Sequence, residues 1–566
     1  MQIALPIVGS VAALLLGSNG GAQSMPPQFN IRITPAAPDA QQHIPYIDVT
    51  VETTGLSVKK GEPVYEVTAN TGFGVTSAKD FRDLTFSDAL GPLATATGDV
   101  PDDGSGVTRL WRAARDVKGP VRAHYRVPIN ASAPPVALPQ YELRTEFGTF
   151  SAASNSFLLV PADAIKRTAK VEWDFTSYGN GGIGISSLGT GSTTSNVPRS
   201  GEEMSAIYFM GGHPGTVART ADGFFAAWQG KPPFPMTPLL TWAGILHRFY
   251  GSVFGFAPAS FGIFARTNTI NPGSGVGLTD SFAFTYNEST KANELRSILA
   301  HEMVHTFIHG LDPAKNATTD QGSSWFSEGL AVHYQRRLPY KAGMISIAEY
   351  LKDINQTASR YYTNIRINVS NSQIPLGFWT DGNIRVLAYD RGSLYFDKVD
   401  AQIRATSRGK RSLDDIVRTM LTARHSERPM DEALYRSLID AELGPQGIKD
   451  LDAMLAGETV VPPSDAYGPE FRRVVVPLRR YEIGYEKMRS GDHSNIVRSV
   501  VAMSNAAKAG LKVGDEILSS RDGDALQLDQ DADNELIIKR AGRMLNLHYL
   551  PRGEKIEGYQ WIAARR

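Results

Sequence analysis

The 566-residue sequence contains no cysteine. This absence excludes disulfide bonds, thiolate ligands for a metal, a cysteine nucleophile and the cysteine of a lipoprotein anchor. Any metal must therefore be held by histidine and carboxylate side chains. An excess of charge is also missing, because 58 Lys and Arg residues balance 58 Asp and Glu residues. The balance gives no support for a nucleic-acid-binding surface, so we expect no nucleic acid partner.

Long apolar segments are missing as well. The run Ile3–Leu16 is too short to span a bilayer comfortably. Small residues at Ala22 and Ser24 follow it, as at a signal peptidase cleavage site. We interpret residues 1–24 as a secretory signal peptide; a disordered start is the alternative, since no Lys or Arg precedes the run. The interpretation predicts a secreted or periplasmic protein whose mature chain does not insert into a membrane.

The most informative stretch contains an HExxH motif at residues 301–305. Apolar residues recur around the motif at helical spacing, and Gly310 is a natural end for such a helix. Residues four positions apart share one face of a helix, so His301 and His305 can bind the same metal ion. Glu302 stands beside them, where it can accept a proton from a metal-activated water.

A catalytic zinc site needs a third protein ligand and one open position. The longer motif HExxHxxGxxH supplies a third His, but Ile and Leu occupy its last two defining positions here. A Glu on a following helix is the other source. The segment WFSEGLA contains Glu328, and Ser323 or Ser324 can cap a new helix before it. We predict one Zn²⁺ held by His301, His305 and Glu328, although cobalt or manganese could use the same ligands.

The rest of the chain divides into parts with different sequence patterns. Residues 25–165 alternate between apolar and polar positions and have turns containing Gly and Pro, which predicts a β-sandwich-like domain. Residues 166–469 combine short strands, the HExxH helix and a helical second half, and we expect the Gly-rich residues 179–191 to be a flexible connection. Residues 470–566 follow a break rich in Pro and form a further domain. The predicted fold is therefore multidomain α+β.

Two stretches in this order resemble a known family. HEMVH followed by WFSEGLA resembles the gluzincin zinc peptidases, and NAAKAGLKVGDEIL, at residues 505–518, resembles part of a PDZ domain. The order of an N-terminal β domain, the gluzincin-like stretch and the PDZ-like stretch is similar to that in the glycyl aminopeptidase family of PDZ-containing metallopeptidases. The resemblance implies a thermolysin-like catalytic domain at residues 166–469, a PDZ domain at residues 470–566, and peptide substrates with a small N-terminal residue such as Gly or Ala.

The resemblance also implies two further site residues. Aminopeptidase N-like gluzincins carry a Tyr-x-Lys-Gly element whose tyrosine steadies the tetrahedral intermediate, and Tyr389 begins a similar element with Arg391 in place of the lysine. Relatives carry a Glu before the HExxH helix that binds the α-amine of the substrate. Thr279 stands at that position, so we expect Asp280 to bind the amine, with Glu288 as the runner-up. A packed tyrosine and a turn-capping aspartate are the structural alternatives.

The pattern as a whole predicts peptide hydrolysis. Glu302 would deprotonate the attacking water, and Tyr389 would donate a hydrogen bond to the oxyanion. The missing glutamate keeps open a secreted endopeptidase that needs no free N-terminus. A non-catalytic protein that presents its PDZ domain on a peptidase scaffold is disfavoured by the intact motif. The expected peptide-binding loop of the PDZ domain, residues 482–485, has one glycine, so we expect weak or no capture of C-terminal peptides.

Overall fold

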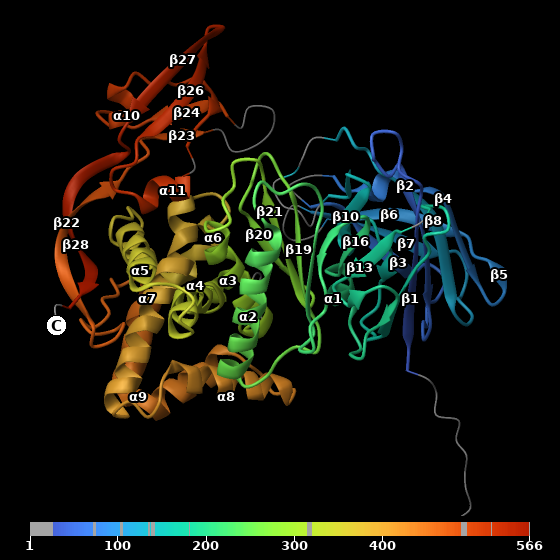
Figure 1. Ribbon diagram of the computed structural model, residues 1–566, viewed down its shortest axis with the longest axis horizontal. Helices are drawn as coiled ribbons and strands as arrows, with labels where there is room; N and C mark the ends of the chain where they lie inside the picture. The colour runs from blue at the N-terminus through green and yellow to red at the C-terminus, as the bar shows by residue number, and fades with distance from the viewer. Residues whose placement is uncertain are drawn as a thin grey trace, which may run out of the picture.

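The computed structural model describes residues 26–71, 75–101, 106–133, 136, 142–179, 181–313, 320–487, 495–521 and 523–564. The predicted signal peptide lies outside these residues. Figure 1 shows a β-rich lobe, a helical lobe beside it and a small C-terminal lobe. Within the described part, no helix has both the length and the apolar character needed to cross a membrane.

The β-rich lobe is built from strands with one face on a core. In β2, for example, every second side chain is buried, which is the period of a half-buried strand. A seven-stranded sheet has the order β15 (Thr193–Thr194), β12 (Thr168–Trp173), β1 (Gln28–Pro35), β2 (Tyr46–Thr53), β8 (Val121–Pro128), β4 (Arg82–Asp88) and β5 (Gly91–Pro92). It shares its core with a sheet of β11 (Val160–Pro161), β3 (Pro63–Asn70), β7 (Val107–Ala113) and β6 (Thr95–Pro101).

A third sheet extends this lobe beyond the boundary expected at residue 165. Its order is β14 (Gly189–Thr190), β13 (Ile183–Ser186), β16 (Tyr208–Gly212), β10 (Thr149–Ala153) and β9 (Arg144–Glu146), and the short helix α1 (Gly201–Ser205) precedes β16. In the first sheet, β12 pairs in parallel with β1, and Thr168 lies opposite Gln28. Residue 165 is therefore inside the lobe, because strands on both sides of it belong to shared sheets.

The Gly-rich residues 179–191 differ from the expected flexible connection, because they contain β13 and β14. Trp173 explains one of the glycines. A Cβ atom built on Gly184 would lie 2.0 Å from Cδ2 of the Trp173 indole. The glycine therefore serves close packing of a strand against an aromatic ring.

A five-stranded sheet connects the β-rich lobe to the helical lobe. Its order is β17 (Gly215–Val217), β18 (Phe224–Trp228), β19 (Phe261–Thr267), β21 (Ser281–Tyr286) and β20 (Gly275–Leu278). One face packs against the third sheet through side chains that include Phe225, Phe264 and Tyr208. The other face packs against α2 (Met236–Phe254) and α3 (Leu295–Phe307). β20 runs antiparallel to β21 at the edge of the sheet, next to α3.

The helical lobe follows α3, which ends at Phe307 rather than near Gly310. Its helices are α4 (Ser324–Lys341), α5 (Ile347–Tyr362), α6 (Ile374–Gly377), α7 (Gly382–Thr406), α8 (Leu413–His425) and α9 (Glu432–Ala456). Two glycines allow α4 and α7 to cross in close contact. A Cβ atom on Gly329 would lie 2.6 Å from the carbonyl carbon of Gly392. This crossing fixes the position of the first turns of α4, which carry Glu328.

The C-terminal lobe begins with a long two-stranded ribbon of β22 (Phe471–Tyr481) and β28 (Arg552–Ala563), which packs on α5. Trp561 in the ribbon is fully buried, and its backbone exchanges two hydrogen bonds with the side chain of Asn355. Beyond the ribbon are β23 (Tyr485–Lys487), β24 (Val497–Val500), α10 (Asn505–Lys508), β25 (Glu516–Ser519), α11 (Gly523–Leu528), β26 (Asn534–Arg540) and β27 (Arg543–Tyr549). Apart from α11, these elements share a small core of their own, and their identity as a PDZ domain stays a prediction.

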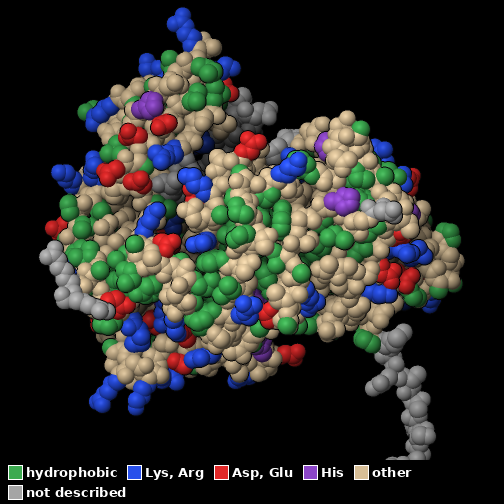
Figure 2. Space-filling view, viewed as in Figure 1, with side chains coloured by type: hydrophobic (Ala, Val, Ile, Leu, Met, Phe, Trp, Pro, Cys, Tyr) green, Lys and Arg blue, Asp and Glu red, His purple; other side chains and the backbone are tan. Residues whose placement is uncertain are grey.

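The surface shows no segregation of charge on the face drawn in Figure 2. Lys and Arg side chains alternate there with Asp and Glu side chains. This distribution is consistent with the balanced composition of the sequence.

Candidate metal centre

Three donor atoms meet between α3 and α4. The Nε2 atoms of His301 and His305 lie 3.2 Å apart. The Oε2 atom of Glu328 lies 3.2 Å from Nε2 of His301 and 3.3 Å from Nε2 of His305. In a tetrahedral site with bonds of about 2.0 Å, ligand atoms are separated by about 3.3 Å. The triangle therefore has the size that one Zn²⁺ requires, and a tetrahedral ion would keep its fourth position for a water or substrate.

The helices explain why these atoms converge. His301 and His305 are one turn apart on α3, so their rings project from the same face. Glu328 lies in the early part of α4, the helix that packs beside α3. Among the residues that the structure describes, no other group of three His, Asp or Glu side chains gathers its ligand atoms in this way.

The electrostatics of the triangle favour a cation. Burial alone would lower the pKa of His305, but the Glu328 carboxylate outweighs burial and raises that pKa to about 9. Burial would raise the pKa of Glu328, yet His305 and His301 hold it well below its ordinary value. A carboxylate that stays ionised beside an imidazole with a raised pKa is suited to binding a divalent ion, which would displace the proton of the imidazole.

Glu302 lies beside the triangle, under the edge strand β20. A Cβ atom on Gly275 would be 2.7 Å from Cγ of Glu302, so the glycine leaves room for the carboxylate. The backbone N–H of Gly277 donates a hydrogen bond to it. Burial raises the pKa of Glu302, although His301 and His305 oppose the shift. A carboxylate with a raised pKa is a better base for the attacking water than an ordinary one.

Tyr389 closes another side of the site from α7. Its ring lies 6.0 Å from the His301 ring, centroid to centroid, and the two planes differ by only 17°. Burial raises the pKa of Tyr389 well above its ordinary value, and the carboxylates of Glu328 and Glu302 raise it further. The phenol therefore stays protonated and can donate a hydrogen bond to a developing oxyanion.

The other residues singled out in the sequence have partners of their own. Asp280 forms the turn between β20 and β21 with φ of 47°, and its carboxylate pairs with Arg199. Arg391 donates to the Val369 carbonyl and to Asn371. Glu288 is exposed. The role of Asp280 as the amine-binding residue stays a prediction.

Sequence reasoning did not select Gln335 and did not foresee how Glu302 is held. Nδ1 of His301 lies 2.8 Å from the Oε1 atom of Gln335. Gln335 follows Glu328 by seven residues, which places both on one face of a helix, and this spacing was the available signal. Gly275 and Gly277 alternate along one strand, a spacing that places both on the same face of β20.

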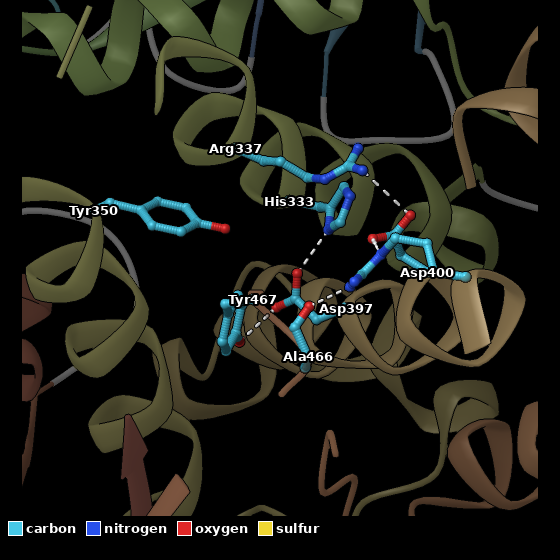
Figure 3. Close-up of a pocket in the computed structure, with 8 residues that line it drawn as sticks. His333, Arg337, Tyr350, Asp397, Asp400, Ala466 and Tyr467 are labelled. Carbon is cyan, nitrogen blue, oxygen red and sulfur yellow. Dashed lines mark hydrogen bonds and ion pairs between the residues drawn. The ribbon is translucent and has the colours of Figure 1, made fainter. Parts of the chain in front are cut away.

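A buried polar cluster lies farther along α4 and α7. Asp397 accepts hydrogen bonds from His333 at 2.6 Å, from Arg336 at 2.6 Å and from the Tyr467 hydroxyl at 2.7 Å. Figure 3 shows His333 and Tyr467 converging on Asp397, beside a cavity of about 170 Å³. His333 thus belongs to this cluster rather than to the metal centre.

The fold and the site together define a class of protein: the chain is a metallopeptidase. Residues 294–374 match the model of the family described as M61 glycyl aminopeptidase. The segment contains the HExxH helix and Glu328. This match confirms, for the segment that carries the motif, the resemblance to the glycyl aminopeptidases found in the sequence.

Solved structures extend the similarity beyond the matched segment. An aminopeptidase N family protein from Idiomarina loihiensis superposes with a TM-score of 0.66 at 14% identity, over 95% of this chain and 98% of that chain. An M1 zinc metallopeptidase from Deinococcus radiodurans has a TM-score of 0.46 at 14% identity, over 77% of this chain and 96% of that chain. No curated protein matches the sequence. The first similarity shows that the fold is shared along nearly the whole chain.

Proposed function

We propose that the protein is a zinc aminopeptidase that removes small N-terminal residues such as Gly and Ala from peptides. The observation that carries the zinc site is the triangle of His301, His305 and Glu328, whose edges of 3.2–3.3 Å match a tetrahedral ion. The M61 match supports the aminopeptidase activity and the preference for small residues. The N-terminal residues 1–24 support secretion or export to the periplasm.

The residues of this chain divide the work of hydrolysis. A bound Zn²⁺ would supply Lewis acidity toward the water and the peptide carbonyl. Glu302 takes the proton of the attacking water and then gives it to the leaving amine. Tyr389 donates a hydrogen bond to the oxygen that becomes negatively charged.

The edge strand β20 supports a peptide as the substrate. β20 is the outer strand of the five-stranded sheet and passes directly over Glu302 through Gly275 and Gly277. An extended peptide can add to such an edge by main-chain hydrogen bonds. Glycines allow the peptide backbone to approach closely. A peptide bound in this way would have a carbonyl group near the metal centre.

The test combines metal content with hydrolysis of Gly and Ala anilides. We expect the wild type to contain about one zinc ion per chain, by the three-ligand rule for catalytic sites. Glu302→Gln should keep the zinc and lose hydrolysis, while Glu328→Ala should lose the zinc. Hydrolysis by Glu302→Gln at the wild-type rate would refute the mechanism, and a wild type that binds no zinc would refute the class of site.

An endopeptidase is the second candidate, and the pairing of Asp280 with Arg199 favours it, because that carboxylate already has a cationic partner. The two candidates differ in their need for a free amine. We compare Asp280→Asn with wild type on Ala-anilide and on an N-acetylated peptide; Asn tolerates the positive φ of this turn. An amine-binding Asp280 predicts a loss of about 1.5–3 kcal/mol on the free amine alone. Equal rates for free and acetylated peptides in the wild type would favour the endopeptidase.

A further inference from the structure

The second ring nitrogen of His301 has a defined partner. Nδ1 of His301 lies 2.8 Å from Oε1 of Gln335. The amide nitrogen of Gln335 donates to Oγ of Ser297 at 3.2 Å and to Oδ2 of Asp353 at 3.2 Å. Because Ser297 and Asp353 each offer an acceptor atom, the amide nitrogen of Gln335 faces them, and the amide oxygen faces His301. His301 must then carry its proton on Nδ1, which leaves the lone pair of Nε2 directed into the donor triangle.

We propose that Gln335 is a positioning residue of the metal centre, which fixes the tautomer and the ring orientation of His301. The proposal rests on the zinc site of the proposed function. A histidine ligand binds a metal through one nitrogen and is oriented by the hydrogen bond of the other. Here that bond is accepted by a neutral amide, so the ring is oriented without adding a further negative charge to those of Glu328 and Glu302.

Gln335 is itself held from two sides. Ser297 belongs to α3, the helix of the histidine ligands, and Asp353 belongs to α5. Asp353 also accepts a hydrogen bond from Arg336 at 3.3 Å, and Arg336 donates to the buried Asp397 at 2.6 Å. A continuous series of hydrogen bonds therefore joins the metal ligand to the polar cluster of Figure 3. This support restricts the Gln335 amide to one orientation.

The test replaces the amide by a thioether of similar length, which accepts hydrogen bonds only weakly. We expect Gln335→Met to bind zinc about 10- to 100-fold more weakly in competition with a chromophoric chelator, the loss found for outer-shell partners of metal ligands. The matched control is Gln402→Met, a half-buried glutamine on α7 that bonds Asp450. The visible spectrum of the Co²⁺-loaded protein should change in Gln335→Met and stay the same in Gln402→Met, because it reports ligand geometry.

A double variant separates positioning from simple packing. Gln335→Glu alone would set a carboxylate 3.2 Å from Asp353, so it is combined with Asp353→Asn, which restores a donor toward residue 335. We expect the double variant to bind zinc at least as tightly as the wild type, since a carboxylate raises the basicity of its histidine partner.

The outcomes distinguish the zinc site itself from the positioning role of Gln335. A wild type without zinc affinity would refute the zinc site itself. A folded Gln335→Met protein with wild-type zinc affinity and an unchanged Co²⁺ spectrum would overturn the positioning role alone. If Gln335→Met does not fold, the double variant decides: weaker zinc binding by a folded double variant overturns the role, and tight binding supports it.

Discussion

Tyr389 contributes one hydroxyl group to the site, and its effect can be isolated. Since its raised pKa keeps the phenol protonated, Tyr389→Phe removes a donor without changing a charge. We expect kcat to fall about 100- to 1,000-fold, as for the loss of one oxyanion donor, with zinc content unchanged. Tyr350→Phe on α5 is the control, because this buried ring lies outside the metal centre. A Tyr389→Phe variant with the kcat of the wild type would make Tyr389 a packing residue.

Asp414 makes a pH-dependent contribution to stability in the helical lobe. Burial would raise its pKa, but Arg337 and Lys341 outweigh burial and lower the pKa to about 2. A lowered pKa stabilises the fold above about pH 4, and the contribution of about 2 kcal/mol is lost as the pH falls toward 2. The Asp414→Asn variant should therefore have a lower melting temperature than the wild type at pH 5. The difference between the two melting temperatures should narrow below pH 4. The exposed Asp440→Asn should show no such narrowing.

At the residue scale, the sequence was sufficient to predict which three side chains meet as candidate ligands, but not which residues surround them. The spacing of His301, His305 and Glu328 reports which side chains share a helix face, and that information is local. The contacts of Gln335 with His301 and of Gly277 with Glu302 join separate elements. Such contacts depend on how the elements pack, which a single sequence pattern does not contain.

The crossing of α4 and α7 controls the metal centre at the scale of elements. A Cβ atom on Gly392 would lie 2.4 Å from the Trp325 carbonyl oxygen, so Gly392→Ala must push the helices apart. We expect a loss of about 1–3 kcal/mol of stability from overpacking, together with weaker zinc binding because Glu328 moves with α4. Gly382→Ala on the same helix is the control, because a Cβ atom there meets nothing within 4 Å. Equal zinc affinity in both variants would contradict this role of the crossing.

The elements themselves were predictable to different degrees. The helical second half of residues 166–469 was expected, because amphipathic periodicity extends over many residues, as it does in α5. The strands β13 and β14 were missed, because both are short and each contains a glycine, Gly184 or Gly189, which weakens the sequence signal of a strand. The sharing of one sheet by strands on both sides of residue 165 was not predictable for another reason: β12 pairs with β1, which lies far away in the sequence.

At the scale of the whole molecule, Trp561 attaches the C-terminal lobe to the helical lobe. The indole is fully buried against Tyr467, with ring centroids 5.0 Å apart. We expect Trp561→Ala to cost about 3–5 kcal/mol, the range for removing a large buried ring, and to release the ribbon from α5. In limited proteolysis, the variant should then be cut near β22 sooner than the wild type is. The exposed Ile562→Ala, its neighbour in the same strand, should leave the digestion pattern unchanged.

The ribbon has a mechanical consequence. The chain enters the C-terminal lobe along β22 and returns along β28, and the two strands are hydrogen-bonded from Phe471 opposite Ala563 to Tyr481 opposite Arg552. A body tethered by one strand can rotate about it, whereas a paired ribbon resists torsion and stretching and bends mainly across its thin dimension. The lobe would therefore move mainly in one plane as the ribbon bends, and it would keep the same side turned outward at every bending angle.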